Sequence, residues 1–233
     1  MDTQVFGLQL PENMTSSPLL ELITALPIEK QHRIKRFVHI EDAVRTLSAD
    51  ILSRLLICDQ LGINNREISF TCNQNGKPML QGSNNLHFNN SHSGQWVLSA
   101  ISDDPVGVDV ERIRELDLDL AKHCFSEQEY HDLNDLGDDQ IKLDYFYDLW
   151  TLKESYIKAV GLGLSMPLSS FTIRKAKDMI QLQTNNALNN CFFKQYTIDP
   201  KYKISLCAQR ENIKEDLVLI SEDEMYQRFI KYL

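Results

Sequence analysis

The chain has 233 residues, of which 42% are hydrophobic and 24% are charged, and its formal net charge is −9. This length allows one large domain or two small lobes with a substantial core. A net negative charge argues against broad binding to nucleic acid or to an anionic membrane surface, so we expect neither as a partner.

The first half of the chain opens with a strongly helical region. Residues 29–58 predict a short helix followed by a longer one, because apolar residues recur at four-residue spacing and Gly62 lies just beyond. Residues 68–72 alternate like a strand, and a turn is predicted at 75–78. A second, more buried strand is predicted at 96–101.

The second half repeats this plan loosely. Its predicted elements, in chain order, are a turn at 103–105, a strand at 107–111, a helix at 142–160 and strands at 170–173 and 202–208. The helix is expected to end at Gly161. We therefore predict an α+β fold of two similar lobes, residues 1–105 and 106–233, with a site in the cleft between them.

The cysteines and the first residues of the chain indicate the cellular compartment in which the protein is expected. The five cysteines, at positions 58, 72, 124, 191 and 207, are scattered without a Cys-x-x-Cys spacing, which argues against a disulfide framework or a zinc site. Residues 1–6 lack the basic and apolar regions of a signal peptide, and no apolar run approaches the roughly 18 residues that span a bilayer. A cytoplasmic protein without membrane attachment is expected.

A basic segment lies within the acidic chain. Between Ile28 and Arg54, six basic residues outnumber four acidic ones: Lys30, Arg33, Lys35, Arg36, Arg45 and Arg54. From Asp103 to Asp139 the balance reverses, with thirteen acidic residues against three basic ones. A local concentration of cations suits the capture of a small anion.

Asp109 and Glu111 lie two residues apart on a predicted strand, so both carboxylates point to the same face. A solvated strand face is the ordinary alternative. The valines that alternate with the two acids, however, place the opposite face of the strand on the core. Mg²⁺ prefers oxygen ligands and usually keeps waters and phosphate oxygens, so two carboxylates and a third from a neighbouring helix would suit it.

Glu154 and Lys158 lie four residues apart, on one face of the predicted helix. An exposed pair of this kind, which stabilises a helix by roughly 0.2–0.5 kcal/mol, is the alternative. The neighbours of this pair are unusually apolar for a surface: Leu149, Trp150, Leu152, Tyr156, Ile157 and Val160. We therefore expect the pair to border an internal cleft, where three carboxylates and an ammonium would equip phosphoryl-transfer chemistry.

Residues 89–94 form a polar segment, which we expect to be a loop. A simple polar turn is one interpretation, and the absence of a G-x-S-x-G elbow argues against a serine-hydrolase nucleophile. Ser91 and His92 could instead donate hydrogen bonds to phosphate oxygens. The sequence has neither a Walker A loop nor a G-x-G-x-x-G fingerprint, so nucleotide phosphates would not be held in those ways.

Five short motifs occur in an informative order: GKP at 76–78, FNNSHSG at 88–94, GVDVE at 107–111, FSEQEY at 125–130 and WTLKESYIKAVGLGL at 150–164. Together they resemble those of the surfactin-type (Sfp-type) 4′-phosphopantetheinyl transferases, from about Lys30 to Ala208. The resemblance implies transfer of 4′-phosphopantetheine from coenzyme A to a serine of an apo peptidyl or acyl carrier protein, with release of adenosine 3′,5′-bisphosphate. It also implies a fused pseudo-dimer, which we expect to act as a monomer in nonribosomal peptide, polyketide or fatty acid synthesis.

The resemblance further implies roles for individual residues. Asp109, Glu111 and Glu154 would bind Mg²⁺, and Lys158 would contact the coenzyme A pyrophosphate. The residues expected around the coenzyme 3′-phosphate are Ser91, His92, Arg45, Lys30 and Arg33, and those expected beside the adenine are Gly76, Lys77 and Pro78. Arg33 stands where lysine is usual in the family, which keeps the charge but changes the hydrogen-bond geometry.

Three questions stay open at this point. The proton of the attacking serine could pass to Glu154 or to a water held by the metal. A different Mg²⁺-dependent phosphoryl-transfer or hydrolytic enzyme and a non-catalytic carrier-binding module are the competing functions, and the second would not require the acids or Lys158. The carrier protein is expected to dock on an apolar or locally basic patch near residues 125–130.

Overall fold

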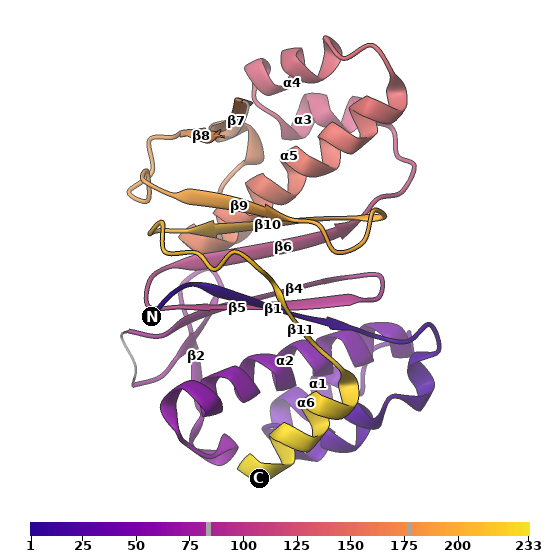
Figure 1. The fold of residues 1–233 in the computed structure, drawn as a ribbon, viewed down its shortest axis with the longest axis vertical. Helices are drawn as coiled ribbons and strands as arrows, with labels where there is room; N and C mark the ends of the chain where they lie inside the picture. The colour runs from indigo at the N-terminus through magenta and orange to yellow at the C-terminus, as the bar shows by residue number, and fades with distance from the viewer. Residues whose placement is uncertain (83–84, 177–178) are drawn as a thin grey trace.

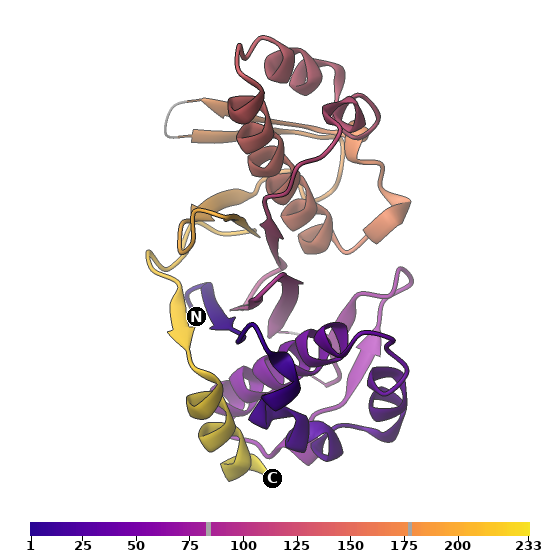
Figure 2. The ribbon, with the colours of Figure 1, turned by 90° about the vertical axis from the view of Figure 1, so that its right-hand side faces the viewer.

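The computed structural model describes residues 1–82, 85–176 and 179–233. Two sheets lie in the middle of the molecule, and helices cover the outer side of each (Figures 1 and 2). The described chain therefore forms two α+β lobes that meet through their sheets, which confirms the predicted fold class.

The first lobe is built on a four-stranded sheet. Its strands are β1 Gln4–Gln9, β4 His87–Ser93, β5 Trp96–Ser102 and β11 Val218–Ile220. They lie in the order β11-β1-β5-β4, and all neighbours are antiparallel except β11 and β1. The lobe also contains helices α1 Ile28–Ile34, α2 Ile40–Leu61 and α6 Glu222–Phe229, and a hairpin of β2 Phe70–Cys72 and β3 Pro78–Leu80.

The second lobe has a three-stranded antiparallel sheet in the order β6-β10-β9. Its strands are β6 Val106–Arg112, β9 Phe192–Tyr196 and β10 Tyr202–Ala208, with a separate hairpin of β7 Thr172–Ala176 and β8 Met179–Gln183. The helices are α3 Ala121–Cys124, α4 Glu127–Asn134 and α5 Asp139–Val160. Short 3-10 helices span Met14–Ser16, Pro18–Ala25, Asn65–Glu67, Leu118–Leu120, Gly163–Ser165, Leu168–Ser170 and Ile230–Tyr232.

The two long helices end as predicted. Gly62 after α2 and Gly161 after α5 have φ of 66° and 78°, a left-handed conformation that glycine adopts without steric cost. Each glycine donates its N–H to the carbonyl four residues earlier. None of the described helices combines the length and apolarity that crossing a bilayer would require.

Strand β5 is buried at all seven positions because both of its faces are covered. Val97 and Ile101 belong to the apolar cluster beneath α2. Trp96, Leu98 and Ala100 belong to a different cluster, which also contains the valines of β6 and residues of β9 and β10. This second cluster joins the two sheets, and it confirms that the valine face of β6 points into a core.

Three predicted elements differ from the structure. Residues 89–93 belong to strand β4 and are not a loop. The strand predicted at 170–173 is β7, which begins at Thr172 because residues 168–170 form a 3-10 turn. The strand predicted at 68–72 is shorter, because β2 begins at Phe70.

The end of the chain returns to the first lobe. Strand β11 pairs with β1, and Met225 and Phe229 of α6 are buried in the cluster beneath α2. A boundary between residues 105 and 106 stays a prediction for the lobe division. The packing of β11 and α6 assigns these C-terminal elements to the first lobe rather than to the second.

Candidate active site

A cleft of about 420 Å³ is lined by residues of both lobes. The first lobe contributes side chains from α1, α2, the β2–β3 hairpin and β4, and the second lobe contributes side chains from β6 and α5. Eight residues predicted from the sequence line it: Lys30, Pro78, Ser91, His92, Asp109, Glu111, Glu154 and Lys158. Lys30, Pro78, Ser91 and His92 from the first half of the chain are thus brought together with the acids and Lys158 from the second half.

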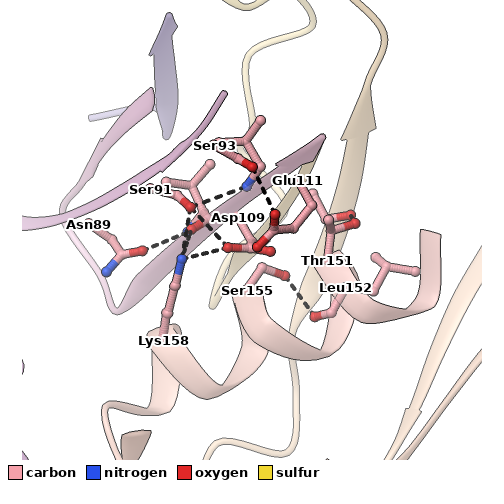
Figure 3. A network of polar contacts seen from close by, with 12 residues as sticks. Asn89, Ser91, Ser93, Asp109, Glu111, Thr151, Leu152, Ser155 and Lys158 are labelled. Atoms are coloured by element: carbon pink, nitrogen blue, oxygen red, sulfur yellow. Dashed lines mark hydrogen bonds and ion pairs between the residues drawn. The ribbon is translucent and has the colours of Figure 1, made fainter. Parts of the chain in front are cut away.

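Polar side chains of β4 bridge the two sheets. β4 and β6 belong to different sheets, and alternate residues of β4 accept the backbone N–H groups of alternate residues of β6: Asn89 from Val108 at 2.9 Å, Ser91 from Val110 at 3.3 Å and Ser93 from Arg112 at 3.1 Å (Figure 3). The two-residue period of both strands makes this match possible. These contacts satisfy N–H groups that an unpaired strand edge would leave without partners.

The same two serines orient the carboxylates of β6. Ser91 Oγ lies 2.9 Å from Asp109 Oδ1, and Ser93 Oγ donates to Glu111 Oε2 at 2.9 Å (Figure 3). A hydroxyl can accept from a backbone N–H and donate its own proton to a carboxylate. Each serine therefore fixes the backbone and an acidic side chain of β6 together.

Lys158 connects α5 to this network. Its Nζ lies 2.6 Å from Asp109 Oδ1 and 2.9 Å from Ser91 Oγ, and it donates to the carbonyl of Val108 at 3.2 Å (Figure 3). The Asp109 side chain is buried, whereas that of Lys158 is partly exposed toward the cleft. The predicted meeting of the β6 acids with the α5 lysine is thus present in the structure.

Gly107 allows this meeting because β6 lies directly against α5. A Cβ atom at Gly107 would be 2.0 Å from the carbonyl oxygen of Ser155 and 2.4 Å from the backbone N of Ala159. Real Cβ atoms do not approach other atoms so closely. A side chain at this position would therefore force the strand and the helix apart.

The carboxylates of the cleft have altered acidities. Burial, and next the nearby charge of Asp109, raise the pKa of Glu111 and that of Glu154 above their ordinary values, while Lys158 opposes the shift. Among the described residues, no hydrogen bond or ion pair involves the Glu154 carboxylate, and the buried Asp109 Oδ2 has no hydrogen-bond partner. An unpartnered buried oxygen beside two more carboxylates fits a hard divalent cation.

The three acids do not by themselves enclose a metal site. Within residues 1–82, 85–176 and 179–233, no group of three His, Cys, Asp or Glu side chains is arranged to hold a metal ion. Mg²⁺ commonly keeps waters and takes oxygens from a substrate phosphate, so protein carboxylates need supply only part of its coordination. The donor set present here is of that partial kind.

The first-lobe wall of the cleft carries the predicted cations. Lys30 forms an ion pair with Asp50, which also accepts from the buried Arg54 at 2.8 Å. Arg45 donates to the carbonyl of Gly94 at 3.0 Å. Asp50 is thus held by two cations, and Lys30 stands at the cleft surface.

His92 lies in the cleft near two further cations. Desolvation, and next the positive charges of Arg45 and Lys158, lower the pKa of His92 below its ordinary value. The ring is therefore mainly neutral at pH 7 without a ligand, and an anion bound beside it would favour its protonated form.

Four predicted coenzyme ligands are not among the residues that line the cleft: Arg33, Arg45, Gly76 and Lys77. Arg33 is exposed on α1, and the Arg45 guanidinium donates to Asp42 and to the carbonyl of Gly94. The ammonium of Lys77 contacts backbone carbonyls of the second lobe. Their roles as coenzyme ligands stay predictions.

Several side chains at the candidate site were not predicted from the sequence. Ser93 is one, although its two-residue spacing from Ser91 repeats the spacing of Asp109 and Glu111 and could have pointed to it. Aromatic residues of the cleft wall were also missed: Phe70, Phe88 and Trp150. They offer apolar surface beside the charged groups.

Lys153, next to Glu154, has a structural role that the sequence did not reveal. Its Nζ lies 2.6 Å from Glu129 Oε1, both side chains are fully buried, and it also donates to the carbonyl of Phe171. Glu129 in turn caps α4 by accepting the N–H of Ser126. This ion pair links α4 to α5, and Lys153 therefore points away from the cleft that Glu154 lines.

Comparison with known proteins bears on what this cleft does. Residues 13–103 match the model "4′-phosphopantetheinyl transferase, N-terminal", and residues 105–207 match the 4′-phosphopantetheinyl transferase superfamily. The chain is 39% identical to the 4′-phosphopantetheinyl transferase ffp of Bacillus subtilis and 36% identical to Sfp of Bacillus subtilis (strain 168), each over 95% of this chain and 99% of the relative. It is 33% identical to psf-1 of Bacillus pumilus, over 97% of this chain and 98% of that protein. With the paired acids and the lysine in one cleft, the chain belongs to the 4′-phosphopantetheinyl transferase family.

Proposed function

We propose that this transferase acts in the cleft between its lobes and that it uses Mg²⁺, coenzyme A and an apo peptidyl or acyl carrier protein. The products would be holo carrier protein and adenosine 3′,5′-bisphosphate. The observation that carries the proposal is the contact of Lys158 with Asp109, with Glu111 and Glu154 lining the same cleft. The five unpaired cysteines of the chain suit a cytoplasmic enzyme, which we propose to be monomeric.

The second-lobe residues would surround the pyrophosphate of coenzyme A. Asp109, Glu111 and Glu154 would hold Mg²⁺, which when bound would neutralise and orient the pyrophosphate. Lys158 donates to Ser91, to Asp109 and to the carbonyl of Val108, and it would exchange one of these bonds for the departing phosphate, whose developing negative charge it would stabilise. Ser91 donates its proton to Asp109, so its predicted contact with the 3′-phosphate stays a prediction, and with Ser93 it would keep the two β6 carboxylates in place during the reaction.

The chemical step would be an in-line displacement. The serine oxygen of the carrier protein would form a bond to the phosphorus that bears pantetheine, and the bond from that phosphorus to the bridging oxygen would break. Glu154, whose carboxylate lines the cleft and is bound by no described residue, would accept the serine proton directly or through a water. The departing group would be adenosine 3′,5′-bisphosphate.

The first-lobe residues would hold the nucleotide end of coenzyme A. Lys30 and His92 line that wall and Arg45 lies near His92, so a bound 3′-phosphate would meet an ammonium and would favour the protonated form of His92. Arg33 would add a further charge from α1. Pro78, with Gly76 before it in the same turn, would border the adenine beside Phe70 and Phe88.

A mass measurement tests this function directly. The purified protein would be incubated with coenzyme A, Mg²⁺ and apo carrier proteins, and the carrier mass would be read before and after. A gain of about 340 Da, the increment of the covalent phosphopantetheine group, is expected with Mg²⁺ and not after chelation. An unmodified carrier under all conditions, or full modification in the presence of chelator, would contradict the proposal.

Replacing His92 by alanine is expected to weaken coenzyme A binding more than turnover. The variant loses a hydrogen bond to a charged phosphate, worth about 1.5–3 kcal/mol, so the KM for coenzyme A should rise by about tenfold or more. With dephospho-coenzyme A, which lacks the 3′-phosphate, the variant and the parent should have similar KM values. His131→Ala, on the exposed surface of α4, is the control. An equal rise of the KM for both coenzymes would show that His92 contacts a part of coenzyme A other than the 3′-phosphate.

A docking surface for the carrier protein beside the basic wall is an alternative to the patch predicted near residues 125–130. Phe125 and Glu129 are buried and do not contribute to that patch, which stays a prediction. Residues 33–40 instead expose three apolar side chains: Phe37, Val38 and Ile40. Arg33, Lys35 and Arg36 of the same segment are exposed and form no ion pair with any described residue. An acidic carrier would complement this combination of apolar and basic groups.

The segment also adjoins the cleft. It connects α1 to α2, and both helices contribute side chains to the cleft lining, Lys30 from α1 and Thr46 and Ala49 from α2. Replacing Lys35 and Arg36 together by glutamate should raise the KM for the carrier by about tenfold and leave that for coenzyme A unchanged. The matched control is Lys201→Glu with Lys231→Glu. An unchanged KM for the carrier would contradict the proposal that the carrier docks on residues 33–40.

A further inference from the structure

The β2–β3 hairpin of the first lobe contacts the last turn of α5 in the second lobe. Lys77, which precedes β3, donates from Nζ to the carbonyl of Lys158 at 2.6 Å, and to those of Ala159 and Val106 at 3.1 Å each. Asn73, which follows β2, donates from Nδ2 to the carbonyl of Gly161 at 2.7 Å. Both ends of the hairpin turn are therefore bound to the other lobe.

These contacts satisfy carbonyls that a helix cannot satisfy by itself. The last four carbonyls of an α-helix have no partner within the helix. In α5 the carbonyl of Ile157 accepts the N–H of Gly161, and Lys77 binds the next two carbonyls. An ammonium at this position also interacts favourably with the negative end of the helix dipole.

The ammonium of Lys77 has no proton to spare. A lysine ammonium has three N–H donors, and the carbonyls of Val106, Lys158 and Ala159 accept one hydrogen bond each. Burial lowers the pKa of Lys77 to about 8, which still leaves the group mostly protonated at pH 7. A phosphate or adenine contact from Nζ would require one of these bonds to break, and Lys77 is not among the residues that line the cleft.

Close packing reinforces the contact. A Cβ atom at Gly161 would lie 3.0 Å from both Asn73 Nδ2 and Lys77 Cδ. The glycine that ends α5 therefore also leaves room for the hairpin. The hairpin itself supplies Phe70 and Pro78 to the first-lobe wall of the cleft.

We propose that Lys77 is a positioning residue, which fixes the last turn of α5 and the start of β6 against the hairpin that forms the opposite wall of the cleft. Lys158 and Glu154 lie on that end of α5, and Asp109 lies three residues beyond Val106 on β6. One ammonium thus sets the distance between the groups that would act on the pyrophosphate and the wall that would hold the nucleotide. This inference rests on the proposed roles of Lys158, Glu154 and Asp109.

Lys77→Met tests the inference because it removes the ammonium and keeps most of the aliphatic chain. We expect kcat to fall by at least tenfold and amide hydrogen exchange in residues 158–162 to become at least tenfold faster. The affinity for adenosine 3′,5′-bisphosphate, measured by calorimetry, should stay within about twofold. Lys77→Arg, which keeps a charged donor, should recover much of both the turnover and the exchange protection. Lys231→Met, at an exposed site near the C-terminus, is the matched control.

A direct ligand role predicts the opposite pattern. If Lys77→Met weakens bisphosphate binding by tenfold or more and leaves hydrogen exchange in residues 158–162 unchanged, Lys77 is a coenzyme ligand and the inference is wrong. Exchange and bisphosphate binding are measured without turnover, so they remain decisive even if the proposed Mg²⁺-dependent mechanism fails. A variant that loses protection throughout the chain would indicate a general stability role and would also overturn the positioning role.

Discussion

Replacing Glu154 by glutamine is expected to lower the turnover of carrier-protein modification by about 10²–10³-fold, the usual cost of losing one preorganised group that stabilises a transition state. The neutral amide can neither help to hold a divalent cation nor accept the proton of the attacking serine. Because no described residue binds the Glu154 carboxylate, the substitution should leave the fold and the melting temperature unchanged. The rate of holo carrier formation, followed by mass spectrometry, measures the effect.

Two further variants sharpen this test. Glu211→Gln, on an exposed residue outside the cleft, should have the turnover of the parent. Asp109→Ala should also abolish transfer, because it removes both the proposed metal ligand and the partner of Lys158. Near-normal turnover in a folded Glu154→Gln or Asp109→Ala protein would contradict the assignment of these residues as Mg²⁺ ligands.

Replacing Gly107 by alanine is expected to destabilise the protein by about 3 kcal/mol, the upper part of the usual range for an overpacked core. The added Cβ would meet backbone atoms of α5 and not the flexible end of a side chain, so the strand or the helix must shift. Since α5 carries Glu154 and Lys158, the same shift should also reduce turnover. Urea unfolding gives the free energy of unfolding, and turnover is measured on the fraction that remains folded.

Gly137→Ala is the control for this substitution. An ideal Cβ at Gly137 has no atom within 4 Å, and its φ is not positive, so alanine should fit without strain. The control should keep the parental unfolding midpoint and turnover. An unchanged midpoint in Gly107→Ala would show that β6 and α5 can separate at little cost, and the argument for close packing at Gly107 would fail.

Structural features that depend only on residues close together in the sequence were predicted correctly. The four-residue spacing of apolar side chains placed α2, and a following glycine placed the ends of both α2 and α5, because periodicity and the left-handed glycine cap act over a few residues. The alternation of valine and acid placed the two faces of β6 correctly. Of these two acids, Asp109 contacts Lys158, and the roles of the acids and of Lys158 stay predictions.

Strand β4 shows where local reasoning failed. Asn89, Ser91 and Ser93 are polar and so suggested a loop, yet they occupy alternate positions of a strand. Their side chains bind the N–H groups of β6, which lies in another sheet. A polar strand of this kind cannot be distinguished from a loop until its partner strand is known.

The sequence alone determined the two-lobed α+β plan, the ends of the long helices and the identity of the acids and lysine that meet in the cleft. Only the tertiary structure decided that Ser93 orients Glu111, that Lys153 is buried on Glu129, and that Lys77 binds the end of α5. The physical reason is that some contacts join residues far apart in the sequence and involve backbone atoms. Lys77 and Lys158 are 81 residues apart, and the atom that Lys77 binds there is a backbone carbonyl. Every residue has such a carbonyl, so the contact leaves no mark in the sequence of its partner.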